Sequence, residues 1–112
     1  MNPAGDKLFS ALGFAKKAGK VKSGELAAEQ TLKSGKARIV LVDALASEKT
    51  RDRWSQMCEN AGVPLVFAEE VGRAIGREAH MVACVTDIGF AQMILRSQAE
   101  KPNFGGTSNG KE

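Results

Sequence analysis

Apolar residues recur along the first part of the chain at helical spacing. Leu8, Phe9, Leu12 and Ala15 lie three or four residues apart within residues 6–19. Residues at this spacing share one side of an α-helix, because the helix repeats about every 3.6 residues. The pattern therefore predicts an amphipathic helix that ends at the close of this segment and packs one face on a core.

Three later segments, at residues 38–43, 63–68 and 82–85, contain continuous apolar runs, the first of them bounded by Arg38 and Asp43. Such runs are typical of strands in parallel sheets, because helices cover both faces of those strands. The first run is therefore expected to be a central parallel strand. Residues 20–22 are expected to add a short extended piece.

Helical segments alternate with these strands, and residues that favour helix ends bound them. Ser47 precedes one helix as an N-cap, and Gly62 follows it as a left-handed C-terminal residue. Thr86 or Asp87 is expected to cap the last helix. The expected helices after the first cover 26–32, 48–60, 69–76 and 88–98. The side chains expected to face the core are Leu26, Leu32, Trp54, Met57, Cys58, Ile88, Ala91, Ile94 and Leu95.

This alternation of helices and strands predicts an α/β protein with helices on both faces of a small sheet. We expect a three-layer α/β/α sandwich whose four-stranded sheet is mainly parallel. Residues 1–99 are expected to form this single domain. Residues 100–112 contain Pro102 and three glycines without apolar periodicity, and are expected to be a disordered tail.

The segment 16–38 joins a helix start to basic residues. Ser23 is expected to accept a hydrogen bond from the first N–H groups of the helix, and Gly35 to end that helix in the left-handed conformation. The helix start carries unpaired N–H donors and a partial positive charge, with Lys20 and Lys22 beside it. This chemistry suits anionic oxygen, and phosphate is the expected ligand.

The charge of the chain is unevenly distributed. Residues 1–38 carry eight Lys or Arg and three acidic residues, a balance of +5, whereas residues 39–99 balance at −2. A one-sided basic surface favours a polyanionic partner. A lysine-rich face that is merely solvated remains the alternative.

Few residues offer catalytic or metal-binding chemistry. His80 is the one histidine of the sequence and has no nucleophile or carboxylate at a recognisable spacing. Cys58 and Cys84 are expected to be small buried hydrophobic residues. Asp43 ends a strand, where a metal ligand is conceivable, but it has no acidic neighbour. We therefore expect no enzyme activity, no cofactor and no metal.

The sequence contains no apolar run long enough to cross a membrane and no signal peptide. A cytoplasmic protein with no membrane partner is therefore expected.

Four motifs carry a resemblance to one protein family: GKARIVLV at 35–42, MCENAGVPLV at 57–66, EVGRAIG at 70–76 and VTDIGFA at 85–91. Over residues 6–98 the chain resembles the kink-turn RNA-binding ribosomal proteins of the L7Ae and L30e type. The last motif is similar to the bacterial YlxQ-like branch. The resemblance implies the α/β/α sandwich and RNA binding at two places.

The first place that the resemblance implies is the start of the second helix. The family motif there is Gly-x-Asn-Glu-x-x-Lys, and Gly24 matches its glycine. Leu26, Ala27 and Gln30 stand where the family has Asn, Glu and Lys. Asn and Glu read the sheared G·A pairs of a kink-turn through base edges, whereas Leu and Ala offer no such hydrogen bonds. The resemblance therefore implies RNA binding with weak base discrimination.

The second place is the loop 77–81. Met81 and Val82 are expected to pack on bases exposed by a bend in the RNA, and Arg77 or His80 to contact phosphate or to stack. The complete set of expected RNA-binding residues is Lys20, Lys22, Ser23, Gly24, Leu26, Ala27, Gln30, Lys33, Lys36, Arg77, His80, Met81 and Val82.

The function expected from these observations is non-enzymatic binding of structured RNA, such as a kink-turn or an internal loop, in ribosomal or other non-coding RNA. The ribosome is a candidate partner. One alternative is a protein–protein adaptor that has kept the fold and lost kink-turn recognition, and another is an enzyme that binds a phosphorylated ligand at Ser23 and Gly24. For Gly24 itself, either close approach of the RNA backbone or a positive φ angle explains the glycine.

Overall fold

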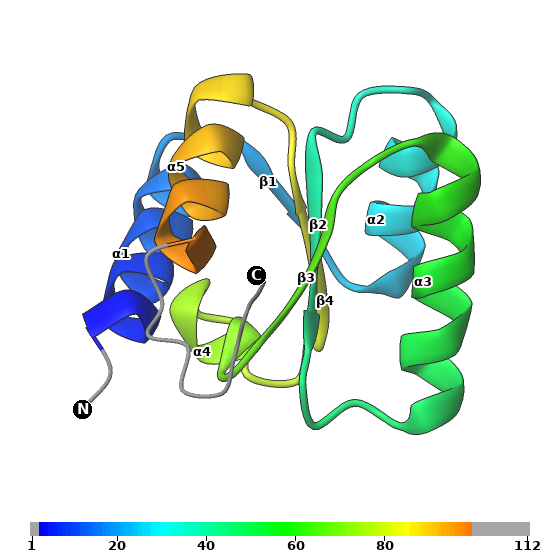
Figure 1. The fold of residues 1–112 in the computed structure, drawn as a ribbon, viewed down its shortest axis with the longest axis horizontal. Helices are drawn as coiled ribbons and strands as arrows, with labels where there is room; N and C mark the ends of the chain where they lie inside the picture. Colours follow the sequence, from blue (N-terminus) through cyan, green and yellow to red (C-terminus); the bar gives the residue numbers. More distant parts are fainter. Residues whose placement is uncertain (1–2, 100–112) are drawn as a thin grey trace, which may run out of the picture.

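The computed structural model describes residues 3–99, and side chains from residue 7 to residue 98. Figure 1 shows the order of the elements along the chain. They are α1 (Pro3–Lys17), β1 (Val21–Ser23), α2 (Glu25–Lys33), β2 (Ile39–Asp43), α3 (Glu48–Ala61), β3 (Leu65–Ala68), α4 (Val71–Ala74), β4 (Val82–Val85) and α5 (Ile88–Ala99).

The four strands form one mixed sheet in the order β1-β4-β2-β3. β2 is parallel to β3, but β4 is antiparallel to both of its neighbours, so the prediction of a mainly parallel sheet was wrong. A parallel partner requires a connection that returns to the other end of the sheet. Instead, β4 begins at the end where β2 finishes, and the N–H of Asp43 donates to the carbonyl of Met81 at 2.7 Å.

Helices cover both faces of the sheet, as the three-layer prediction required. Figure 1 shows α1, α4 and α5 on one face and α2 and α3 on the other. Side chains alternate along β2, so Ile39 and Leu41 enter the core beneath α1 and α5, while Val40 and Val42 enter the core beneath α2 and α3. All residues of β2 are buried, which confirms its central position.

Several predicted helix ends are confirmed. The hydroxyl of Ser47 accepts a hydrogen bond from the Thr50 N–H, and Gly62 adopts the left-handed conformation after α3. Gly35, with φ 79°, follows α2, and its N–H donates to the Leu32 carbonyl. Asp87 caps α5, because its carboxylate accepts from the Phe90 N–H at 3.0 Å.

Three residues expected in the core are exposed instead. Leu26 is 71% exposed, Ile88 57% and Leu95 37%. On α2 the buried residues are Ala28 and Leu32, four positions apart. A residue two positions before Ala28 points to the opposite side of a helix, so Leu26 faces away from the core.

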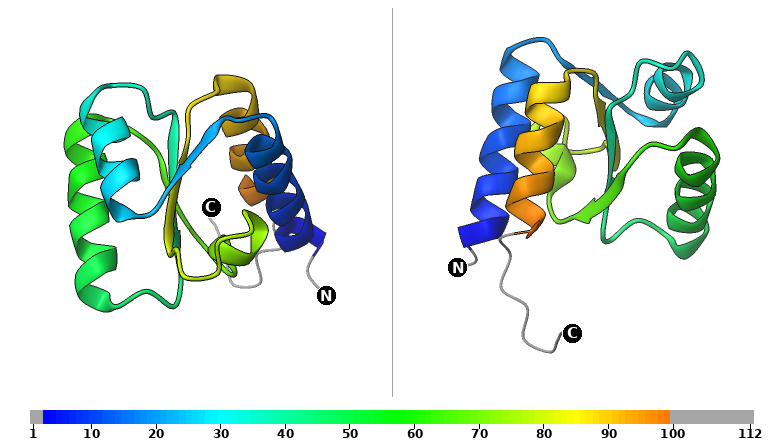
Figure 2. Two further views of the ribbon diagram at one scale, coloured as in Figure 1. Left: turned by 180° about the vertical axis from the view of Figure 1, so that it is seen from behind. Right: turned by 45° about the horizontal axis from the view of Figure 1, so that its top comes forward.

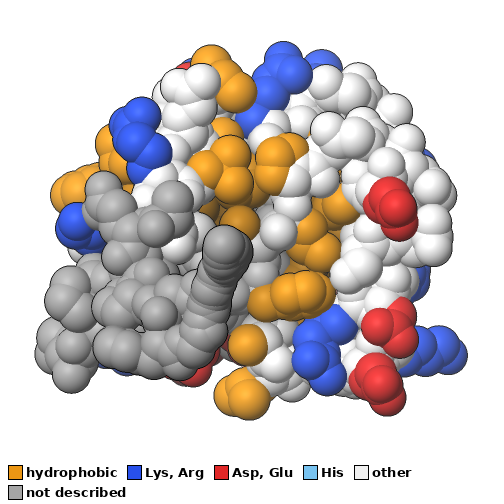
Figure 3. Space-filling model, in the orientation of Figure 1, with side chains coloured by type: hydrophobic (Ala, Val, Ile, Leu, Met, Phe, Trp, Pro, Cys, Tyr) orange, Lys and Arg blue, Asp and Glu red, His pale blue; other side chains and the backbone are white. Residues whose placement is uncertain are grey.

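β3 forms the exposed edge of the sheet on the side shown in Figure 3, where hydrophobic side chains follow the middle of the molecule. Phe67 on this strand is 43% exposed. The expected tail at 100–112 lies outside the described residues. Among the helices that the structure describes, none is long and apolar enough to cross a membrane.

Candidate nucleic-acid interface

The junction between β1 and α2 is held by a contact with the distant loop 77–81. Gly24, not Ser23, is the N-cap of α2, and no described side chain caps this helix. The prediction that Ser23 caps α2 was therefore wrong. Its hydroxyl lies 2.8 Å from Nδ1 of His80, and the Gly24 N–H donates to the Val82 carbonyl at 2.8 Å. The first bond fastens the start of α2 to the loop, and the second fastens it to the first residue of β4.

Gly24 has φ 89° and ψ 151°, a conformation that is essentially restricted to glycine. A Cβ at this position would also lie 3.4 Å from Cε1 of His80. The interpretation of Gly24 as a positive-φ residue is thus supported. Any other residue would strain the backbone here, so a side chain at this position is expected to lower the stability of the fold.

The first turn of α2 carries an acidic residue whose charge is balanced by α3. The Glu25 carboxylate accepts hydrogen bonds from Arg53 at 2.8 Å and from the Trp54 indole N–H at 3.3 Å. The positive charge of Arg53 offsets the carboxylate, so Glu25 opposes an incoming anion less than an unpaired acid would. The N–H groups of this turn remain without a side-chain acceptor among the described residues, which suits an anionic ligand.

Arg53 also contacts Glu29 at 2.5 Å, and Lys33 contacts the same carboxylate at 2.8 Å. The Lys33 hydrogen bond lowers the pKa of Glu29, burial partly opposes this, and Arg53 adds to the lowering. Lys33 is thus paired within its own helix. Its side chain is still 72% exposed, so it remains within reach of a partner.

The loop 77–81 rests directly on the backbone of α4. A Cβ at Gly72 would lie 2.5 Å from the Arg77 carbonyl oxygen and 2.6 Å from the His80 carbonyl oxygen. The Arg77 N–H donates to the Gly72 carbonyl at 2.8 Å, and the His80 N–H donates to the Arg77 carbonyl at 2.8 Å. The glycine in EVGRAIG therefore lets the loop approach closely and sets the position of His80.

Asp43 has a structural role. The residue is buried, and its carboxylate accepts hydrogen bonds from the Leu45 N–H at 2.9 Å and from the Val71 N–H at 3.2 Å. These bonds tie the end of β2 to the start of α4. Within residues 3–99 no group of three or more His, Cys, Asp or Glu side chains is arranged to hold a metal ion.

An open hollow of about 690 Å³ lies between the α2 start, the loop 77–81 and the segment that enters α3. Six of the predicted residues line it: Ser23, Gly24, Leu26, Ala27, His80 and Met81. Sequence reasoning missed the other lining residues, which are Glu25, Ala46, Ser47, Thr50 and Ala79. Ser47 and Thr50 gave a helix-cap signal, but nothing in the sequence indicated that this cap lies beside α2.

The predicted basic residues do not surround the hollow. Lys20 lies at the far end of β1, where its carbonyl accepts from the Thr86 N–H at 2.9 Å. Lys33 is the last residue of α2, roughly 12 Å from the first at about 1.5 Å per residue, and Lys36 follows the helix. Lys22 lies in the middle of β1 and is exposed. Figure 2, left, shows β1 and α2 on one side of the molecule. The four lysines lie on or next to these two elements, and we call them the lysine strip.

Of the remaining predicted residues, Gln30 is exposed on α2 and Arg77 is exposed at the start of its loop, outside the lining of the hollow. Val82 is fully buried. Its side chain belongs to the core beneath α2 and α3, so the prediction that Val82 packs on RNA bases was wrong. Its carbonyl instead positions Gly24.

Both cysteines are free thiols in the core beneath α2 and α3. Burial, together with the neighbouring Cys84, raises the pKa of Cys58 to about 11. Burial also raises the pKa of Cys84, although hydrogen bonding to Thr31 opposes the shift. A thiol that stays protonated at neutral pH is a poor nucleophile.

Sequence comparisons agree on one family. The model of the ribosomal protein L7Ae/L30e/S12e/Gadd45 family matches residues 6–94. The RNA-binding protein YlxQ of Bacillus subtilis (strain 168) is 36% identical over 95 residues, which cover 82% of this chain and 95% of YlxQ.

Solved structures share the fold. A protein with unknown function from Bacillus halodurans C has a TM-score of 0.78 and 27% identity, covering 84% of this chain and 98% of its own. The Giardia lamblia 15.5kD RNA binding protein has a TM-score of 0.70 and 23% identity, covering 86% of this chain and 88% of its own. The motifs that suggested the resemblance are thus confirmed, and this chain belongs to the ribosomal protein L7Ae/L30e/S12e/Gadd45 family, where it is similar to the bacterial protein YlxQ.

Proposed function

We propose that this protein binds structured RNA without catalysing a reaction, and that the hollow beside the α2 start is its contact surface. The family and the similarity to the RNA-binding protein YlxQ support RNA as the partner. The observation that carries the proposal is the contact between Ser23 and His80, because it brings both candidate RNA-binding segments to one site.

The hollow suits an unstacked base. Leu26 and Met81, which are 71% and 41% exposed, line it from α2 and from the loop 77–81. Proteins that recognise irregular RNA commonly pack apolar or aromatic side chains against bases splayed from the helix. A bend or an internal loop supplies such bases, whereas a regular RNA duplex does not.

The lysine strip suits the phosphate backbone that continues away from that base. Lys20, Lys22 and Lys36 are exposed, and β1 and α2 carry them along one side of the molecule. Lys33 remains exposed although it is paired with Glu29. Cations arranged in this way bind phosphates without regard to sequence, and the affinity falls as salt concentration rises.

Leu26 and Ala27 limit what can be read at the helix start, since neither side chain has a hydrogen-bond donor or acceptor. We therefore assign specificity to RNA shape rather than to base identity. Kink-turn-like or internal-loop RNA in ribosomal or other non-coding RNA is the substrate class proposed, with the cytoplasm as the compartment and the ribosome as a candidate partner.

In-cell ultraviolet crosslinking of the full chain, followed by RNA sequencing, tests this function. We expect enrichment of a small set of non-coding RNAs at bends or internal loops, with crosslinked peptides from residues 20–30 or 77–81. Recovery of RNA no greater than for a variant with Lys20, Lys22, Lys33 and Lys36 changed to Glu would instead favour the protein–protein adaptor.

A further inference from the structure

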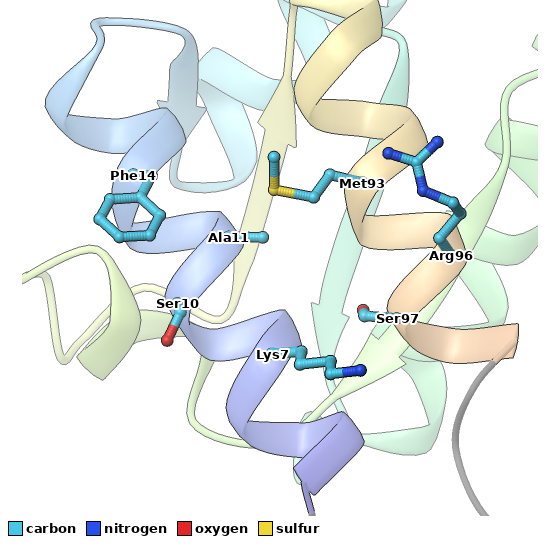
Figure 4. A pocket seen from close by; sticks show the side chains of 7 residues that line it. All are labelled: Lys7, Ser10, Ala11, Phe14, Met93, Arg96 and Ser97. Carbon is cyan, nitrogen blue, oxygen red and sulfur yellow. The ribbon is translucent and has the colours of Figure 1, made fainter.

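A second concave surface lies on the opposite side of the sheet from the proposed RNA site. It is a groove of about 400 Å³ between α1 and α5. Figure 4 shows that Ala11 and Phe14 approach it from α1, and that the Met93 side chain extends toward it from α5. The complete lining is Lys7, Ser10, Ala11, Phe14, Met93, Arg96 and Ser97.

Large apolar side chains in this groove are exposed although the helices are well packed beneath it. Phe14 is 57% exposed and Met93 41%, while Ala11 at the bottom of the groove is buried. The Ser97 hydroxyl donates its hydrogen to the Ile94 carbonyl at 2.7 Å, so it adds no free donor to the groove. The groove therefore offers a methyl, a thioether and an aromatic ring.

The described side chains of α1 and α5 carry charge of one sign. Lys16 and Lys17 close α1, and Arg96 lies in the last turn of α5. Residues 7–17 and 88–98, whose side chains the structure describes, contain four Lys or Arg and no Asp or Glu. The opposite layer is mixed, since α2 and α3 pair their acids with Arg53 and Lys33.

We propose that the groove between α1 and α5 docks an acidic amphipathic helix of another protein. A helix presents apolar side chains at three- and four-residue spacing, which fits a groove between two helices. Acidic residues flanking those apolar positions complement Lys17 and Arg96, and a negatively charged partner is steered to this surface.

Two other occupants fit less well. A second copy of the chain in a symmetric dimer would place this basic surface against itself, because a two-fold interface uses the same patch on both subunits. RNA shares the negative charge, but it packs single splayed bases against apolar side chains, whereas an amphipathic helix lays a row of apolar side chains along a groove between two helices.

Fluorescence anisotropy with a defined probe tests the proposal. The probe is a labelled amphipathic peptide of about 16 residues, about four helical turns, with leucines on one face and glutamates on the other. We expect saturable binding to the full chain, and a loss of about tenfold or more in affinity for Phe14→Ser, for Met93→Ser and for Arg96→Gln. Met81→Ser is the matched control, because Met81 is as exposed as Met93 but lies outside this groove.

Each alternative has its own readout. Equal binding of a peptide that carries lysines in place of the glutamates would overturn the charge argument. The absence of saturable binding would overturn the assignment of a docking site to the groove. Equal losses of affinity for Met81→Ser and Met93→Ser would overturn it as well. Competition by a single-stranded RNA that is sensitive to Phe14→Ser assigns the groove to RNA instead. Peptide binding that appears only in the full-chain variant Phe104→Ser assigns the groove to residues 100–112. RNA binding by the Phe14→Ser variant is measured in parallel and is expected to be unchanged.

Discussion

Ser23 and His80 lie 57 positions apart in the sequence, yet the Ser23 hydroxyl is 2.8 Å from Nδ1 of His80. The same imidazole also lies against Gly24, where a Cβ would be 3.4 Å from Cε1. One side chain thus joins the start of α2 to the loop 77–81. The proposed RNA site depends on this joint, because each of the two segments supplies part of the hollow.

Removing the joint should loosen the loop before it unfolds the protein. We expect Ser23→Ala and His80→Ala each to reduce RNA affinity about fivefold, since a net hydrogen bond contributes about 1 kcal/mol. The double variant should lose little more than either single variant. Hydrogen exchange should show faster exchange of the loop 77–81 in all three variants. Fully additive losses with unchanged exchange would mean that the two residues act independently.

Gly72 in α4 should not tolerate a side chain. In Gly72→Ala the new methyl would lie 2.5 Å from the Arg77 carbonyl oxygen, so the loop must shift. We expect a destabilisation of about 2 kcal/mol, typical of overpacking, together with loss of RNA affinity. The measurements are urea unfolding and RNA titration.

Gly13→Ala is the matched control, because its Cβ would meet only the Ala74 carbonyl oxygen, at 3.5 Å, among the described atoms. Gly13 lies inside α1, where alanine is the better helix former by about 0.5–1 kcal/mol. We therefore expect Gly13→Ala to raise stability and leave RNA binding intact. Similar behaviour of the two variants would remove the special role assigned to Gly72.

Stability should fall at alkaline pH through Cys58. Burial raises the pKa of this thiol from 9.0 to about 11 in the folded chain, so between these values the unfolded chain releases a proton that the folded chain keeps. Unfolding is then favoured as pH rises, by a total on the order of 3 kcal/mol once the pH exceeds both values. Urea unfolding at about pH 8 and about pH 10 should show a smaller loss in Cys58→Ala than in the original chain. Equal losses would contradict the assigned cause.

Base discrimination at the α2 start should be weak. Good base-edge contacts contribute about 1–3 kcal/mol each, and Leu26 and Ala27 make none. A kink-turn with its G·A pairs should therefore bind less than about tenfold better than one with those pairs replaced. Leu26→Asn combined with Ala27→Glu should increase that ratio at little cost in stability, since Leu26 is 71% exposed. A ratio of several hundred in the original chain would mean that other residues read these bases.

Much of the fold was predictable because burial leaves a local signal. The apolar runs located β2, β3 and β4, and Ser47 and Asp87 marked helix starts through chemistry confined to a few neighbouring residues. Strand direction has no such signal. β4 is as apolar as a parallel strand, and its antiparallel pairing follows from the end of the sheet at which the chain enters it.

The site was only partly predictable for a related reason. Ser23 has the residue type of an N-cap, but its partner lies far along the sequence in His80, and no local pattern signals that choice. Leu26 was placed inside because apolar residues usually are, whereas Ala28 and Leu32 fill the inward face of α2. The lysines were expected beside the hollow, but β1 and α2 carry some of them to the far end of the sheet.

The central claim is that the side of the molecule formed by β1, α2 and the loop 77–81 binds RNA. The most direct test is an equilibrium titration of an RNA stem interrupted by an internal loop, at several salt concentrations. It compares the original chain with a variant in which Lys20, Lys22, Lys33 and Lys36 are changed to Glu. The control changes Lys16, Lys17, Lys49 and Arg96 to Glu, which alters the net charge equally.

We predict that the first variant loses binding while circular dichroism stays native. Any binding that remains at low salt should have a log–log salt slope smaller by about three, since four phosphate contacts contribute about 0.7–0.9 each. The control should keep most of the affinity and nearly the same slope. Equal losses in both variants, or full affinity in the first, would contradict the assignment of RNA binding to this side of the molecule.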